Sequence, residues 1–230
     1  MLNETTARQR LERVHERIQA ACGRCGRDPA SVTLVAVSKT HEAACVAALH
    51  QAGQTLFGES YVQEALPKIE SLARLPLSWH FIGRLQKNKV KYVTSRFALI
   101  HSVDSLELAA ALHRKCAAQG ITQDILLQVN LAGEAAKAGC APEEALSLAT
   151  AIAGMDSLKL LGLMLMPPWH EDPEVNRPLF AKARELQCRL TGQLDMELPH
   201  LSMGMSHDME QAIEEGATLI RVGTDLFGAR

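Results

Sequence analysis

Short apolar runs alternate with longer amphipathic stretches along the whole chain, and this alternation occurs eight times. Most of the runs are continuously apolar, which is typical of strands buried on both faces of a parallel sheet. A helix is expected before the first run, because Leu11, Val14 and Ile18 recur at spacings of three and four. The expected strands are residues 32–37, 55–57, 79–83, 98–103, 124–130, 159–165, 198–203 and 218–222.

The stretches between these runs have the boundary residues of helices. Asp104, Pro142 and Ser206 stand where helices are expected to begin, since Asp and Ser cap helix N-termini and Pro fits the first turn. Glycine often takes the left-handed position that ends a helix. Four glycines are expected to do so here, at Gly53, Gly120, Gly154 and Gly216.

Eight strands with helical connections in 230 residues predict an α/β fold, a (β/α)8 TIM barrel with an extra N-terminal helix. The alternative is a doubly wound open sheet, which usually has a glycine-rich turn after its first strand. Here Ser38-Lys39-Thr40 follows the first strand, so the barrel is favoured. Because no Pro/Ser/Gly-rich linker interrupts the pattern, we expect residues 1–230 to form a single domain.

The charge balance excludes some classes of partner. The chain has 24 Lys plus Arg against 26 Asp plus Glu, a net charge of −2, whereas nucleic-acid-binding proteins usually carry a basic excess. No apolar run approaches the roughly 18–20 residues of a membrane span, and the N-terminus lacks the apolar core of a signal peptide. We therefore expect a cytoplasmic protein that binds neither nucleic acid nor a membrane. We also expect it to be a monomer.

The cysteines and histidines do not predict a metal site. Cys22 and Cys25 are closely spaced, but a zinc site needs two more ligands at matching spacing, and none follows. Two interpretations stay open for this pair: a redox-active C-x-x-C motif, and two thiols in the turn after the first helix. The nine histidines show no metal-binding spacing. His80 and His101 lie in expected strands, where a hydrogen-bonded core role is the default.

A barrel of this kind places its site at the carboxyl ends of the strands. Lys39 directly follows the first strand. Partial desolvation there favours the neutral amine, which is a Schiff-base nucleophile toward an aldehyde or ketone. A solvated lysine at a strand end is the alternative interpretation.

The ends of the last two strands predict a phosphate site. Ser206 follows the seventh strand and can supply a hydroxyl, while Gly223 and Thr224 follow the eighth. Gly223 lets the backbone approach an anion closely, and Thr224 adds a second hydroxyl. Asp208 opposes this assignment, because it would repel an anion unless it points away. Ser206 alone could also be only a structural helix cap.

Arg221 bears on which ligand such a site would hold. An imine-forming amine beside a phosphate cradle suits a phosphorylated sugar in a lysine-imine aldolase, and it also suits pyridoxal 5′-phosphate (PLP). Arg221 lies two residues before Gly223 and therefore can point into the barrel. A guanidinium beside a pyridine nitrogen would hold that nitrogen unprotonated, which favours PLP, whereas the aldolase gives Arg221 no role. An Arg–carboxylate pair inside the barrel is the alternative.

Several segments carry a resemblance to a known family. They include LVAVSKTH (34–41), FGESYVQE (57–64), WHFIGRLQKNK (79–89) and LSMGMSHDMEQAIEEGATLIRVGTDLFGAR (201–230). In these segments the chain resembles the YggS/PROSC family of PLP-homeostasis, or PLP-binding, proteins, and the resemblance covers essentially the whole chain. It implies a barrel similar to the N-terminal domain of alanine racemase, with PLP held as an aldimine on Lys39. It also implies phosphate contacts at Ser206, Gly223 and Thr224, a ring-nitrogen partner at Arg221, and packing near the cofactor by Met203.

The sequence departs from the family pattern at three positions. Ser60 stands beside the expected cofactor, where the family commonly has Asn. Arg84 replaces a frequent His and adds a positive charge at the rim, and Ala136 replaces a usual Ser. None of these changes touches Lys39 or the segment around Arg221.

The leading hypothesis is a PLP-binding protein without catalytic turnover, which stores or delivers the cofactor and keeps the free aldehyde low. Its partners would be PLP itself and PLP-dependent apo-enzymes or vitamin B6 kinases and oxidases. The rival is a PLP-dependent, racemase-like enzyme, which needs an acid/base on each face of the bound amino acid. Racemases of similar barrel take the second base, a tyrosine, from a further domain. This chain has only Tyr61 and Tyr92, and no such domain is expected.

Overall fold

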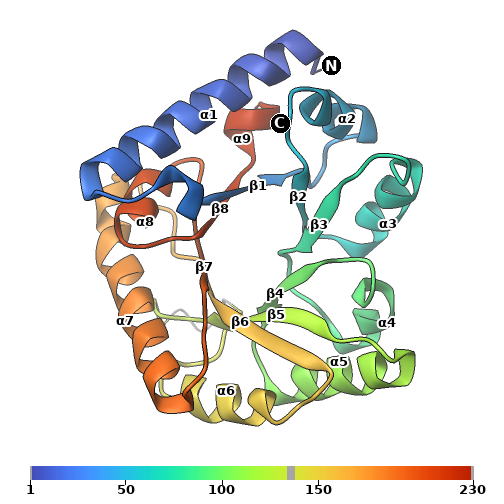
Figure 1. Cartoon of the computed structure of the whole chain (residues 1–230), viewed down its shortest axis with the longest axis vertical. Coiled ribbons are helices and arrows are strands. Elements are labelled where there is room, and N and C mark those ends of the chain that lie inside the picture. Colours follow the sequence, from blue (N-terminus) through green and yellow to red (C-terminus); the bar gives the residue numbers. More distant parts are fainter. Residues whose placement is uncertain (1, 134–137, 229–230) are drawn as a thin grey trace.

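Parallel strands surround the centre of the molecule and close on themselves. The computed structural model describes residues 2–133 and 138–228. Within them the strands form a closed barrel in sequence order, and β8 closes it by pairing with β1 (Figure 1). This confirms the predicted fold, with each predicted strand boundary displaced by at most two residues. The strands are β1 (Thr33–Val37), β2 (Leu56–Glu59), β3 (Ser78–Phe81), β4 (Leu99–Val103), β5 (Gln123–Val129), β6 (Leu158–Leu165), β7 (His200–Met205) and β8 (Leu219–Val222).

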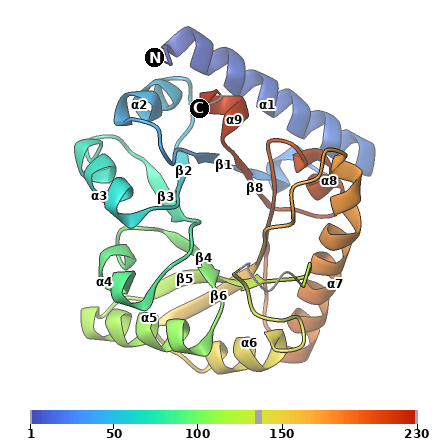
Figure 2. The same ribbon diagram turned by 180° about the vertical axis from the view of Figure 1, so that it is seen from behind.

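Helices surround the barrel on its outside, as both views show (Figures 1 and 2). The additional N-terminal helix α1 packs against α2, α8 and α9. The helices are α1 (Glu4–Cys25), α2 (Ala43–Gln51), α3 (Val62–Ser71), α4 (Val90–Val93), α5 (Leu106–Gln119), α6 (Ala145–Ala153), α7 (Arg177–Leu194), α8 (Met209–Glu214) and α9 (Thr224–Phe227). Short 3-10 turns are η1 (Pro29–Ser31), η2 (Lys87–Lys89) and η3 (Pro173–Asn176).

Some predicted helix boundaries need correction. Ser105, rather than Asp104, caps α5, because its hydroxyl accepts the N–H of Leu108. Helix α6 begins three residues after Pro142, following a turn. Gly53, Gly120 and Gly216 have positive φ angles as predicted, but Gly154 has a φ of −82°. Gly154 keeps a right-handed conformation because one more turn, closed by Met155 N–H to Ile152 O, leads into β6.

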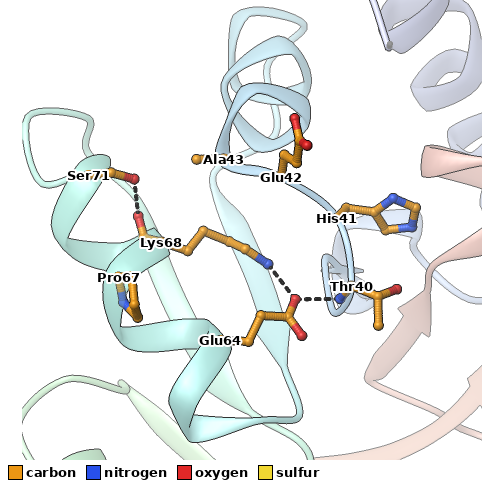
Figure 3. Close-up of a pocket in the computed structure, with 8 residues that line it drawn as sticks. All are labelled: Thr40, His41, Glu42, Ala43, Glu64, Pro67, Lys68 and Ser71. Carbon is orange, nitrogen blue, oxygen red and sulfur yellow. Dashed lines mark hydrogen bonds and ion pairs between the residues drawn. The ribbon is translucent and has the colours of Figure 1, made fainter.

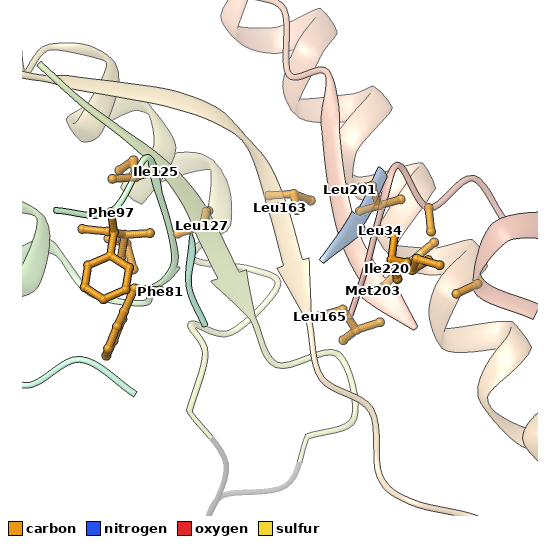
Figure 4. Packing of buried hydrophobic residues seen from close by; sticks show 14 of the residues in the cluster. Leu34, Phe81, Phe97, Ile125, Leu127, Leu163, Leu165, Leu201, Met203 and Ile220 are labelled. Atoms are coloured by element: carbon orange, nitrogen blue, oxygen red, sulfur yellow. The ribbon is translucent and has the colours of Figure 1, made fainter. Parts of the chain in front are cut away.

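The apolar core has two layers, because successive strand residues point to opposite sides of a barrel wall. The outer layer, between strands and helices, is the larger and contains Leu34, Phe81 and Leu163 (Figure 4). Helix α1 contributes its predicted apolar stripe to this layer. The small inner cluster consists of Val35, Leu99, Leu126, Met164 and Leu219.

Two further sequence expectations concern thiols and membranes. Cys22 and Cys25 lie within α1 rather than in a turn after it; Cys22 is buried and Cys25 is exposed, and both are free thiols. Among the described residues no cluster of His, Cys, Asp and Glu could hold a metal ion. No helix in the described part of the chain combines the length and apolarity needed to cross a membrane.

Candidate functional site

A cavity of about 590 Å³ opens at the carboxyl ends of β1, β2, β7 and β8. This volume lies within the range of about 300–1,000 Å³ that is typical of small-molecule sites. Parallel strands of a barrel all end at the same face, so residues distant in sequence meet there. The cavity is lined by all but one of the predicted site residues: Lys39, Ser60, Ser206, Arg221, Gly223 and Thr224.

Arg221 is the most deeply buried charge of the cavity wall. Its side chain is 4% exposed and enters the barrel from β8. One guanidinium nitrogen donates to Ser202 Oγ at 2.7 Å, and another donates to the carbonyl of Leu165 at 2.9 Å. Within the described residues no carboxylate lies at ion-pair distance from Arg221, so the structure gives no Arg–carboxylate pair. Arg221 is instead held by neutral acceptors.

A chain of hydrogen bonds continues from Arg221 through the barrel interior. Ser202 Oγ lies 2.9 Å from His101 Nδ1, and His101 Nε2 lies 3.0 Å from His80 Nδ1. Because Arg221 donates to Ser202, the Ser202 hydroxyl can donate to His101, whose Nε2–H can then donate to His80. His80 and His101 are therefore hydrogen-bonded core residues, as their position in the strands predicted.

Burial determines the charge states of the residues in this chain of hydrogen bonds. It lowers the pKa of His80 from 6.5 to about 4 and the pKa of His101 well below its ordinary value, so both rings are neutral at pH 7. Burial also lowers the pKa of Arg221 to about 10, while the nearby Asp208 acts to raise it. Arg221 therefore remains protonated at neutral pH. Of these three residues, only Arg221 is positively charged at neutral pH, and it lines the cavity.

The predicted phosphate end contains two hydroxyls and a backbone donor. Gly223 N–H donates to Ser206 Oγ at 3.3 Å, so the turns after β7 and β8 lie against each other. Ser206 does not cap α8, because that helix begins at Met209 with Asp208 before it. Asp208 is buried away from the cavity: it accepts the N–H of Met205 at 2.8 Å and the side-chain amide of Asn176 at 3.0 Å. It therefore does not face an anion held by Ser206.

Met203 corrects the predicted site. Its side chain is fully buried in the outer core layer, between strands and helices (Figure 4), and does not line the cavity. Alternation along β7 explains this, because Ser202 points into the barrel and its neighbour Met203 therefore points outward. After Met203 the pairing shifts, since Met205 lies three positions beyond Ser202 while its partner Arg221 lies only two beyond Leu219. Gly204, with a φ of 86°, lies in this irregularity, and an added Cβ there would meet the Cβ of Ala212 at 2.6 Å. Met205 therefore reaches the cavity in place of Met203.

The rim of the cavity is partly apolar. Tyr61, Met166 and Trp169 line it and are exposed, and the Trp169 ring stacks on His207 with centroids 5.8 Å apart. Arg84, one of the departures from the family pattern, also lines the cavity, whereas Ala136 lies outside the described residues.

The family model described as "Alanine racemase, N-terminal domain" matches residues 10–230. The pyridoxal phosphate homeostasis protein of Aquifex aeolicus is 48% identical over 222 residues, which cover 96% of this chain and 97% of that protein. The chain belongs to the pyridoxal phosphate homeostasis protein family.

Solved structures agree with this family membership. PipY of Synechococcus elongatus, whose structure was determined with PLP bound, is 40% identical and has a TM-score of 0.83, with 94% of this chain and all of that one covered. An alanine racemase of Clostridium difficile has a TM-score of 0.78 at 12% identity, covering all of this chain and 58% of that one. That second likeness is one of fold alone.

Sequence reasoning missed several members of the site. One is Ser202, which like Arg221 carries a polar group inside an otherwise apolar strand. Such a polar residue in a buried strand needs a hydrogen-bond partner, and this need could have linked Ser202 to Arg221. Met205 and Trp169 gave no comparable signal, because their places depend on a bulge and a loop.

Proposed function

We propose that this protein binds PLP in the cavity between Lys39 and Arg221, and that it stores or delivers the cofactor without catalytic turnover. The observation that carries the proposal is a buried, protonated arginine held only by neutral acceptors within the described residues, in one cavity with a lysine and a phosphate-type cradle. The name of the Aquifex aeolicus relative and the PLP bound to PipY support it.

The donors of the cavity fit the chemistry of PLP. Ser206 Oγ, Thr224 and the backbone of Gly223 suit a phosphate, and Arg221 suits an acceptor such as a pyridine nitrogen. Lys39 supplies the amine that an aldehyde requires. When bound, PLP supplies an aldehyde that a lysine can hold covalently and a ring that can withdraw electrons.

The position of Arg221 suits a carrier that must not react. A guanidinium has no acceptor atom, so beside a ring nitrogen it can only donate and it opposes protonation there. An unprotonated ring withdraws electrons less strongly, which suppresses reactions of a bound amino acid. This effect limits turnover but does not by itself exclude a racemase.

The described residues give less support to a racemase. Two-base racemisation needs an oriented acid/base on each face of the bound amino acid. Tyr61 lines the cavity, but it is 55% exposed, and its hydroxyl has no hydrogen-bond partner among the described residues. We therefore favour the carrier, acting as a single-domain monomer in the cytoplasm. Its six free cysteines suit a reducing compartment, and its partners would be PLP-dependent apo-enzymes and vitamin B6 kinases or oxidases.

Covalent labelling tests the binding site. Purified protein is mixed with PLP, its absorbance is recorded, and borohydride reduction followed by peptide mapping locates the adduct. We expect the adduct on Lys39, its loss in Lys39→Ala, and its retention in Lys87→Ala, which alters an exposed lysine near the same face. An adduct on Lys87, or one spread over surface lysines, would contradict the proposed site.

Turnover tests the carrier against the racemase. The PLP-loaded protein is incubated with L-alanine, and D-alanine is measured; we expect none above the level of Lys39→Ala. The same loaded protein should restore activity to an added PLP-dependent apo-enzyme. Sustained D-alanine production that Tyr61→Phe abolishes would favour the racemase.

A further inference from the structure

A second group of buried charges lies outside the PLP cavity, on the other side of the Lys39 segment. Its centre is Lys68 of α3, which is 6% exposed and borders an open pocket of about 420 Å³ (Figure 3). The ammonium nitrogen donates to Glu59 Oε1 at 2.6 Å, to Ser38 O at 2.8 Å and to Glu64 Oε1 at 3.0 Å. These three bonds use all the donors of a lysine.

This group holds both chain neighbours of Lys39. Before it, Ser38 is bound twice, since its carbonyl accepts from Lys68 and its hydroxyl donates to Glu59 Oε1 at 2.7 Å. After it, the N–H of Thr40 donates to Glu64, the same carboxylate that Lys68 binds (Figure 3). The two ends of the three-residue segment are thus tied to one cluster on β2 and α3.

The backbone at Thr40 requires such an anchor. Its φ is 66°, in the left-handed region that non-glycine residues rarely adopt and that β-branched residues disfavour most. A conformation of this kind persists only where surrounding contacts impose it, and it is frequent beside functional groups. Helix α2 begins only at Ala43, so the helix itself does not impose it. Two bonds hold it: the Thr40 N–H donates to Glu64, and the His41 N–H closes a turn on the Ser38 carbonyl at 3.1 Å.

The cluster is an expensive way to stabilise a fold. Glu59 is fully buried, its Oε2 has no partner among the described residues, and burial raises its pKa. Buried ion pairs often stabilise a protein no better than apolar side chains of the same volume, because both ions lose their hydration. A role in holding a specific local conformation accounts for the cluster better than a role in general stability.

We propose that Lys68, Glu59 and Glu64 are positioning residues, which fix the backbone around Lys39 so that its amine enters the PLP cavity. None of the three lines that cavity, so they act through the Ser38–Thr40 backbone rather than by touching the cofactor. This inference rests on the proposed function, in which Lys39 holds PLP. It predicts that losing the cluster weakens the covalent contact and spares the other contacts.

Two ligands distinguish the covalent contact through Lys39 from the phosphate and ring contacts. PLP can bond to Lys39, whereas pyridoxine 5′-phosphate has an alcohol in place of the aldehyde and reports only the phosphate and ring contacts. Glu64→Ala removes the Thr40 anchor but leaves the Lys68–Glu59 pair. We expect it to lower PLP affinity about tenfold, as for the loss of a hydrogen bond to a charged group, and to leave pyridoxine 5′-phosphate affinity unchanged. Glu70→Ala, at an exposed glutamate of the same helix, should change neither.

The lysine is tested by a matched pair of variants. Lys68→Met leaves Glu59 buried without its cation and can fail to fold for that reason. The double variant Glu59→Met, Lys68→Met removes both charges at similar volume and should fold. We expect it to show the same selective loss of PLP affinity. Amide hydrogen exchange of residues 38–41 in ligand-free protein should also be faster in Glu64→Ala than in Glu70→Ala.

The outcomes distinguish this inference from the proposed function. Equal loss of both ligands in a folded Glu64→Ala protein would make the cluster merely structural, and unchanged PLP affinity would overturn the positioning role. If the wild-type protein does not bond PLP at all, the proposed function fails. The hydrogen-exchange comparison then still tests the anchor, and unchanged exchange at residues 38–41 would overturn it.

Discussion

Two buried cations lie near Lys39, one beside its backbone and one across its cavity, and the protein surrounds them differently. On the β1–β2 side, Lys68 is paired with the carboxylates of Glu59 and Glu64. On the β7–β8 side, Arg221 donates to a hydroxyl of Ser202 and a backbone carbonyl. The first cation is neutralised where it stands, and the second keeps its charge for whatever enters the cavity. Burial alone therefore does not tell a structural cation from a functional one; its partners do.

The neutral state of His101 also depends on the nearby charge of Arg221. A protonated His101 beside Arg221 would place two like charges in a low-dielectric interior, which is costly. Burial and the nearby cation both lower the pKa of His101, so the ring serves as a neutral link. Arg221 also has five N–H donors, and within the described residues its bonds to Ser202 and Leu165 do not use all of them.

The sharpest test of this contrast is the free energy of unfolding. Lys68→Met strands Glu59 as a buried, unpaired carboxylate, and we expect a loss of about 3–5 kcal/mol. Arg221→Met breaks no ion pair among the described residues and should cost about 1–3 kcal/mol, for acceptors that lose their donor. The double variant Glu59→Met, Lys68→Met should regain most of the loss. Urea unfolding measures all three, and an Arg221→Met cost above that of Lys68→Met would break the comparison.

The second test concerns ligand contacts on the β7–β8 side. Ser206→Ala and Thr224→Ala should each weaken PLP binding by about 1.5–3 kcal/mol, the range for hydrogen bonds to a charged group. Pyridoxal, which lacks the phosphate, should be nearly indifferent to both changes. Affinities for the two ligands follow from absorbance titration. An equal loss for both ligands would mean that the variants loosen the barrel rather than remove phosphate contacts.

Acid pH separates His80, the far end of the hydrogen-bond chain from Arg221, from Glu59 beside Lys68, because the pKa shifts of these two groups have opposite signs. The folded pKa of His80 is about 4 against 6.5 unfolded, so the unfolded chain binds more protons between these values and stability falls as pH falls. From pH 7 to pH 5 this loss is about 2 kcal/mol for His80. The raised pKa of Glu59 acts oppositely, since its contribution is lost as pH rises. Urea unfolding at both pH values should show a smaller loss in His80→Asn; an unchanged loss would contradict the neutral histidine.

The last test is read in the absorbance spectrum rather than in the free energy of unfolding. In Arg221→Glu, a carboxyl group accepts from a protonated ring nitrogen, so the ring withdraws electrons more strongly. We expect bound PLP to keep its bond to Lys39, a shifted absorbance, and slow transamination of added amino acids. Arg84→Glu, at the cavity rim, is the matched control and should show neither change. A folded, PLP-loaded Arg221→Glu protein with an unchanged spectrum would show that Arg221 does not face the ring; far-UV circular dichroism confirms folding.

Much of the fold and part of the site could be read from local pattern. The apolar runs predicted every strand, because a buried parallel strand must be apolar on both faces over its whole length. Lys39, Ser206 and Thr224 were predicted to meet because parallel strands all end at one face of a barrel. Met203 lies outside the cavity because it alternates with Ser202, which points inward. Local pattern is silent on Met205, which lines the cavity because the irregular pairing of β7 with β8 reverses the facing that strict alternation would give it.

The sequence by itself determined the barrel, the family and the ring of residues around the cavity, since each depends on residues close together in the chain or on a common strand direction. The tertiary structure decided which hydrogen-bond and ion-pair partners those residues have. Lys68 is in sequence an ordinary helix lysine, and it becomes an anchor for the Lys39 segment only because α3 packs against the end of β1, thirty residues earlier. Arg221 and His101 are likewise joined through Ser202 by folding alone. Charge state and partner choice depend on burial and distance in space, which no local pattern encodes.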